Sequence, residues 1–243
     1  MVGLPPSVLR RGAAGAALFC VLIAYYELSS HLWRAGVWLD VAWLAFVLIP
    51  AAFALVLFAL PLADRRGLLA AGLCAGGLAA LLTAVDANVS ANFLRLAAAT
   101  FLGFWFLRLF ETVGWVVTVA CIIPWVDAYS VWRGPTKTIL NQHPHVFTVL
   151  SFAFPVPGTH SAANLGVPDL FFFALFLAAA YHYGLRVVPT WLCLVASLGG
   201  TIALTVWWNL SGLPALPGIA LGFLLPNADL LRRRLRRDRA APA

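Results

Sequence analysis

The sequence predicts an all-α membrane protein, a polytopic transmembrane helical bundle of about eight spans, from three observations. The 243-residue chain is 63% hydrophobic and only 10% charged, with a mean hydropathy of +0.92. Because soluble domains carry roughly 25% charged residues, this chain cannot cover a water-facing surface in the usual way. Its apolar runs approach or exceed the length of about 20 residues that a helix needs to cross a bilayer. Short breaks that carry charge, Gly or Pro separate these runs.

The apolar runs divide the chain into eight predicted spans. They cover residues 13–33, 37–62, 67–85, 92–109, 112–132, 166–185, 187–209 and 213–231. The first run continues through Tyr25, Tyr26 and Glu27 without a small-residue cleavage pattern, so we expect a retained helix and not a removed signal peptide. The four cysteines lie singly in separate runs, so the sequence indicates no disulfide framework and no metal site.

One long connection, about 133–165, separates the fifth and sixth predicted spans. It holds a short apolar piece, 146–157, which Pro155 and Pro157 interrupt. A piece of this length cannot span a bilayer, so we expect an interfacial or re-entrant segment.

The positive charges predict the orientation in the membrane. With eight spans, one side carries the residues Arg10, Arg11, Arg65, Arg66, Arg108, Arg186 and the C-terminal arginine cluster. The other side carries only Arg34, Arg95, Arg133 and Lys137. The positive-inside rule then places both termini in the cytoplasm of a multi-pass protein of the cell membrane.

Two aspartates, Asp127 and Asp169, lie inside apolar runs, whereas most other acidic residues lie at predicted span ends. An ionisable group facing hydrocarbon costs roughly 2.5–3.5 kcal/mol, so it normally faces a partner or a cavity and marks a functional site. Asp127 comes shortly before the outer end of its span, and Asp169 shortly after the outer start of the next one. Neighbouring antiparallel helices would therefore bring the carboxylates to similar depths.

Placement alone leaves three interpretations of this pair. Two close carboxylates share a proton, so that one acts as a general base on water while the other polarises a scissile carbonyl, as in aspartyl proteases. The aspartates would also suit a proton or cation pathway in a transporter. A structural ion pair or a capped helix start is the third interpretation.

Three motifs surround and follow the aspartates. They are Asp-Ala-Tyr-Ser-Val-Trp at 127–132, Gly-Val-Pro-Asp at 166–169 and Pro-Ala-Leu-Pro at 214–217. This ordered set resembles the presenilin and signal peptide peptidase family of intramembrane aspartyl proteases, and is most similar to archaeal and bacterial presenilin-like members. The resemblance covers residues 115–231. Pro168 stands where the family has a second glycine, and Val126 stands where it usually has tyrosine.

The resemblance implies an intramembrane aspartyl endopeptidase that hydrolyses transmembrane segments, with Asp127 and Asp169 as the catalytic pair and no cofactor. Substrate-binding and site-shaping roles would fall to residues Tyr129, Gly166, Val167, Pro168, Pro214, Ala215, Leu216 and Pro217. An inactive presenilin-like scaffold, through Pro168 and Val126, and a proton-coupled small transporter remain the alternatives.

The sequence also predicts the domain organisation of the chain and its partners. We interpret 1–243 as a single integral membrane domain, with N-terminal helices in 12–110, a catalytic-type half in 112–231 and a basic cytoplasmic tail in 232–243. The expected partners are membrane lipids and a transmembrane peptide substrate, with a second copy or an accessory subunit left open. The basic tail suits anionic headgroups, so no nucleic-acid partner is expected. The predicted orientation resembles that of signal peptide peptidase, which favours type II substrates.

Overall fold

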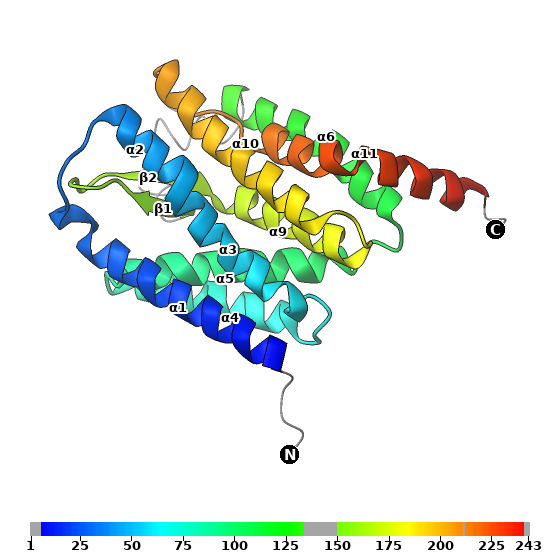
Figure 1. The fold of residues 1–243 in the computed structure, drawn as a ribbon, viewed down its shortest axis with the longest axis horizontal. Coiled ribbons are helices and arrows are strands. Elements are labelled where there is room, and N and C mark those ends of the chain that lie inside the picture. The colour runs from blue at the N-terminus through cyan, green and yellow to red at the C-terminus, as the bar shows by residue number, and fades with distance from the viewer. Residues whose placement is uncertain (1–5, 134–149, 211, 241–243) are drawn as a thin grey trace.

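The computed structural model describes residues 6–133, 150–210 and 212–240, and this part of the chain is mostly helical (Figure 1). This part contains eight helices. They are α1 (Pro6–Leu28), the continuous helix Val37–Leu62, α4 (Leu68–Ala84), α5 (Asn88–Leu107), α6 (Val113–Arg133), α9 (Val167–His182), α10 (Val187–Trp207) and α11 (Leu216–Ala240). The second of these comprises α2 (Val37–Trp43), a π-helical turn (Leu44–Leu48), α3 (Ile49–Ala59) and a 3-10 turn (Leu60–Leu62).

Five of these helices are long and apolar enough to cross a membrane. They are Arg10–His31, Val37–Leu62, Asn88–Leu107, Val113–Val131 and Val187–Trp207. Helices α4 and α9 are apolar but shorter, with 17 and 16 residues. A membrane protein built from helices is therefore the architecture that the chain supports.

The helices follow the predicted segments, with differences at several of their ends. Helix α1 begins at Pro6 instead of residue 13, and α5 begins at Asn88 instead of residue 92. Helix α11 continues to Ala240, so most of the predicted tail 232–243 extends a helix. Arginine is a strong helix former, and positive charge near a helix C-terminus interacts favourably with the helix dipole, which explains this extension.

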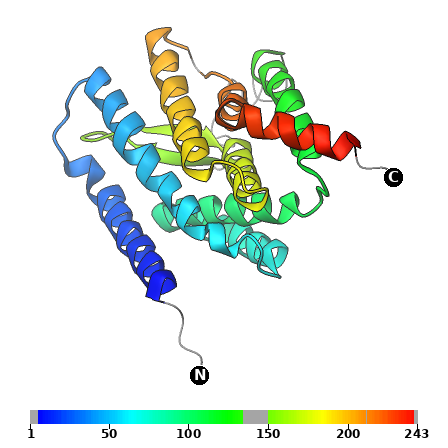
Figure 2. The ribbon, with the colours of Figure 1, turned by 45° about the vertical axis from the view of Figure 1, so that its right-hand side comes forward.

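Helix α9 forms the centre of the bundle, as Figures 1 and 2 show from two directions. Every residue from Phe173 to Ala180 is fully buried. Phe173 packs on Phe53 of α3 with ring centroids 4.1 Å apart, and Phe176 stacks on Phe223 of α11 at 5.0 Å. Side chains all around α9 are thus covered by its neighbours, which explains how a helix of 16 residues is held rigidly in place.

Helix α5 lies against α9 at a glycine contact. A Cβ atom added to Gly103 would lie 2.7 Å from the carbonyl oxygen of Phe171. Only glycine permits this approach of the two helices, which is the way in which small residues let membrane helices pack closely.

A β-hairpin precedes α9. Strand β1 (Ser151–Pro155) pairs antiparallel with β2 (Ala162–Gly166), with Ser151 opposite Gly166 and Pro155 opposite Ala162. An interfacial or re-entrant segment was expected at 146–157 in an all-α fold. Residues 151–155 of it form a strand, so the fold is mostly helical with one hairpin, while residues 146–149 lie outside the described part. The alternation in Ser-Phe-Ala-Phe-Pro, which buries Phe152 and Phe154, is the strand signal.

The hairpin turn docks on the segment after α1. Gly158 has a φ of +67°, and a Cβ atom there would lie 2.6 Å from the backbone nitrogen of Arg34. Its N–H donates a 2.8 Å hydrogen bond to the carbonyl of Ser29. The sequence Pro-Gly at 157–158 therefore marks a turn that glycine alone satisfies.

Candidate functional site

The first aspartate lies where α6 meets the start of α11. Asp127 is half-buried and accepts a 3.0 Å hydrogen bond from the N–H of Leu216, the first residue of α11. It also accepts a hydrogen bond from the N–H of Ala215. The first N–H groups of a helix have no partner within the helix, so a carboxylate at this position satisfies them and interacts favourably with the helix dipole.

The motif Pro-Ala-Leu-Pro explains why these amides are available to Asp127. Pro214 lies in the irregular segment before α11 and Pro217 in the first turn of that helix, where a missing N–H costs nothing. Ala215 and Leu216, between the prolines, are 5% and 4% exposed. The segment therefore presents two buried donors that need an acceptor from another helix, and Asp127 supplies it.

The second aspartate lies in the first turn of α9, directly after β2. Gly166 has extended backbone and caps the helix, Val167 and Pro168 follow, and Asp169 is the third helical residue. The Asp169 carboxylate accepts a hydrogen bond from the N–H of Gly166. This is the carboxylate half of a capping box, in which the third helical residue reaches back to the cap.

Pro168, which stands where the presenilin-type motif has glycine, is compatible with this geometry. Pro168 occupies one of the first two helical positions of α9, where its fixed φ suits the helix and its missing N–H has no intrahelical use. Glycine at 166 has a separate reason, since a Cβ atom there would lie 3.3 Å from Oδ2 of Asp169. The chain therefore retains glycine where the carboxylate comes close and has proline where it is tolerated.

The two carboxylates are brought to the same end of the bundle and interact electrostatically. They come from two helices, and each also binds backbone N–H groups at the start of a helix, α11 for Asp127 and α9 for Asp169. The arrangement places two acidic groups, backbone donors and an extended strand in one region. Two acidic groups with backbone donors beside them are the kind of groups that general acid–base catalysis uses.

Tyr129 is the predicted site residue that the structure does not bring to this region. Its side chain is 66% exposed, and it follows Asp127 by two residues, about 200° around a helix of 3.6 residues per turn. Val126 is likewise 55% exposed. The substitution of valine for the family's tyrosine therefore falls on the outward face of α6.

Two features near the aspartates were missed by the sequence reasoning. One is the strand β2, whose last residue is Gly166. The other is Pro124, inside α6 and one turn before Asp127. A proline within a helix leaves the carbonyl four residues earlier without its partner and bends the helix. The position of Pro124 in an apolar run was the signal that could have indicated it.

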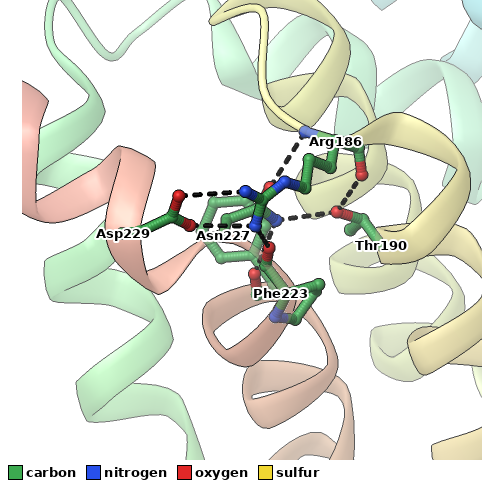
Figure 3. A network of polar contacts seen from close by, with 6 residues as sticks. Arg186, Thr190, Phe223, Asn227 and Asp229 are labelled. Atoms are coloured by element: carbon green, nitrogen blue, oxygen red, sulfur yellow. Dashed lines mark hydrogen bonds and ion pairs between the residues drawn. The ribbon is translucent and has the colours of Figure 1, made fainter.

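A second polar cluster ties α10 to the later part of α11 (Figure 3). Arg186 forms two 2.9 Å hydrogen bonds with Asp229, and its backbone N–H donates to Asn227 at 2.9 Å. Asn227 is fully buried and donates to Thr190 at 2.7 Å and to the carbonyl of Phe223 at 2.8 Å. Asn227 follows Leu216 by 11 residues, roughly 16 Å along a helix. This cluster holds α11 in place and is separate from the aspartate pair.

Comparison with known proteins returns no match: no family model, no curated protein and no solved structure matches the chain. The class to which the fold and site point is a helical membrane protein with two interacting aspartates whose carboxylates bind backbone N–H groups at helix starts.

Proposed function

We propose that this chain is an intramembrane aspartyl endopeptidase of the presenilin and signal peptide peptidase kind. The observation that carries the proposal is the meeting of Asp127 and Asp169, from separate helices, beside the Pro-Ala-Leu-Pro segment. The three motifs that resemble the family are separated in the sequence, and one or two residues of each interact: Asp127 with Ala215 and Leu216, and Asp127 with Asp169. This convergence supports a common role for them.

The proposed reaction is hydrolysis of a peptide bond by water. The ionised carboxylate of the pair removes a proton from water, and the water oxygen attacks the carbonyl carbon. The protonated carboxyl donates a hydrogen bond to the carbonyl oxygen, and the departing nitrogen receives a proton as the C–N bond breaks. No metal or organic cofactor takes part in this scheme.

The backbone near the pair suits an unwound substrate. A transmembrane helix must open before water can reach its peptide bonds, and the opened chain then needs hydrogen-bond partners. Strand β2 ends at Gly166, beside Asp169, and residues 212–215, which are neither helix nor strand, lead into α11 beside Asp127. Extended backbone such as that of β2 pairs with peptides by adding a strand.

The deciding experiment is cleavage of a transmembrane peptide in liposomes by the wild type, Asp127→Asn and Asp169→Asn. Asp86→Asn is the matched control, because Asp86 is exposed and its φ of 58° is tolerated by asparagine. We expect cleavage by the wild type and the control, and none by the other two variants. Cleavage by either site variant would remove that residue from the mechanism, and a wild type that neither cleaves nor binds a transition-state analogue would overturn the proposal.

One observation favours a second candidate, a non-catalytic membrane scaffold. Both carboxylates bind amides at helix starts, which is also what a purely structural cap does. In that case the aspartates would contribute to stability alone, and the wild type would not cleave.

The proposed topology has eight spans, with both termini in the cytoplasm. It adds α4, α9 and α11 to the five helices that meet the length and hydropathy of a span by themselves. Residues 173–180 of α9 are fully buried within the bundle, so this part of the helix would not face lipid. Reporter fusions after residue 243 and within 134–149 test this arrangement, and we expect cytoplasmic and external signals respectively. The reverse polarity, or two signals on one side, would overturn it.

A further inference from the structure

The edge of β1 that faces away from β2, called here the outer edge, is bound by side chains instead of a third strand. The partners come from α1 and α5. Asn92 and Tyr26 bind Ala153, Arg95 binds the carbonyl of Ser151, and Tyr25 binds the carbonyl of Pro155. Pro155 has no N–H, so at that position the outer edge offers only an acceptor.

Asn92 makes the most strand-like of these contacts. Its side-chain amide nitrogen donates to the Ala153 carbonyl at 2.9 Å, and its oxygen accepts from the Ala153 N–H at 2.8 Å. A neighbouring strand would bind both groups of one residue in the same way. Asn92 is only 3% exposed and lies on α5, in the predicted N-terminal half, whereas the hairpin belongs to the other half.

The pairing of the two strands links the contact between Asn92 and Ala153 to the position of the Gly166 N–H beside Asp169. In an antiparallel pair, successive residues point their backbone groups alternately towards and away from the partner strand. Ladder bonds at Val156 and Leu150 point inward, while Ala153 points outward to Asn92. Ser151 therefore points outward, and so does its partner Gly166 on the opposite edge. The N–H of Gly166 is in this way directed from the hairpin to the Asp169 carboxylate.

We propose that Asn92 is a positioning residue: by binding both backbone groups of Ala153 it fixes the hairpin on α5, and so directs the Gly166 N–H to Asp169. A slip of two residues along β1 would move β2 by about 7 Å at 3.4 Å per residue, and the start of α9 with Asp169, which follows β2 directly, would have to move with it. The effect on catalysis rests on the proposed function, while the effect on the hairpin does not.

Hydrogen exchange of the full chain in detergent micelles, followed peptide by peptide, tests the inference without any substrate. We expect exchange of peptides covering 151–155 and 162–169 to become about tenfold faster in Asn92→Leu, because a buried backbone donor and acceptor lose their partners. Peptides of α10 should keep their exchange rates. Asn88→Leu, one turn earlier on α5 and exposed, is the matched control and should match the wild type.

Two conservative variants keep the test decisive if Asn92→Leu does not fold. Asn92→Asp retains the acceptor for the Ala153 N–H, and Tyr26→Phe removes only one bond to the Ala153 carbonyl. Both should accelerate exchange in the same two regions by less than Asn92→Leu does. Equal acceleration in α10 would show a general loss of stability, and unchanged exchange in 162–169 would show that the contact holds β1 alone. Either result overturns the inference.

An activity readout then separates positioning from substrate binding. Once the wild type is shown to cleave a transmembrane peptide, Asn92→Leu should lower kcat about tenfold with little change in KM, as expected when a contact acts on the reacting groups. A raised KM with unchanged kcat would assign Asn92 to substrate binding and overturn the proposal. If the wild type does not cleave, the proposed function fails while the exchange result still decides the hairpin contact.

Discussion

The N–H of Leu216 donates a 3.0 Å hydrogen bond to the carboxylate of Asp127, 89 positions earlier in the chain. Through this bond a side chain on α6 caps the N-terminus of α11. Capping requires an acceptor oxygen at this position, whereas hydrolysis also requires an ionisable acid. Substitutions that retain one property and remove the other therefore distinguish the structural role of Asp127 from the catalytic one.

Asp127→Asn and Asp127→Ala should differ in stability but not in activity. Asparagine retains an oxygen that accepts from Leu216, so we expect only a small change in the free energy of unfolding. Alanine removes the cap, which should cost about 1 kcal/mol. Denaturant unfolding in detergent measures the difference, and cleavage should be absent in both variants. Equal stability of the two variants would show that the bond to Leu216 contributes little.

Pro168→Gly tests whether proline, at the position where the presenilin-type motif has glycine, limits cleavage at the proposed site. Since Pro168 lies in the first turn of α9, proline is compatible with the fold there. Glycine should lower the free energy of unfolding by about 0.4–1 kcal/mol, because it gives the unfolded chain more conformations. Cleavage should persist in both forms. Cleavage by the glycine variant alone would mean that Pro168 inactivates the natural chain.

The positions of the helices follow from the sequence because hydropathy and charge determine which segments can enter a membrane. The depth of Asp127 and Asp169 in a membrane stays a prediction from the same pattern. The bond of Asp169 to Gly166 is local, since the carboxylate three residues after the cap is the spacing of a capping box. The bond of Asp127 to Leu216 is not predictable, because it depends on how α6 packs against the start of α11, which no local pattern in the sequence specifies.

The hairpin was missed for a related reason. Five-residue strands have a weak signal, and the prolines at 155 and 157 suggested an interrupted apolar segment instead. The partners that hold β1 are distant in the sequence, and Asn92 lies 61 residues away from Ala153. Within a predicted span, an asparagine looks like a polar helix start until the strand beside it is known.

Gly103→Ala should loosen the contact between α5 and α9. The added methyl group would lie 2.7 Å from the Phe171 carbonyl oxygen, so the helices must move apart. Overpacking of this kind costs about 1–3 kcal/mol. Gly77→Ala on α4 is the control, because nothing lies within 4 Å of the added atom and alanine is the better helix former. Thermal unfolding should show a lower Tm for Gly103→Ala and an unchanged or higher Tm for Gly77→Ala.

Asn227 and Asp229 belong to one polar cluster but should contribute very differently to stability. Asn227 is fully buried, and its amide binds Arg186, Thr190 and Phe223. Asn227→Ala removes the acceptor of the Arg186 backbone N–H and the bonds that join Thr190 to α11 away from water, so it should lower the free energy of unfolding by about 1–3 kcal/mol.

Asp229→Asn is the comparison within the same cluster. The side chains of Arg186 and Asp229 are 48% and 47% exposed, and ion pairs this exposed contribute little to stability because solvent screens them. The loss should shrink further as salt is raised, because screening weakens exposed pairs. Denaturant unfolding at low and high salt measures both variants. A larger loss for Asp229→Asn than for Asn227→Ala would show that the ion pair, and not the buried amide, joins α10 to α11.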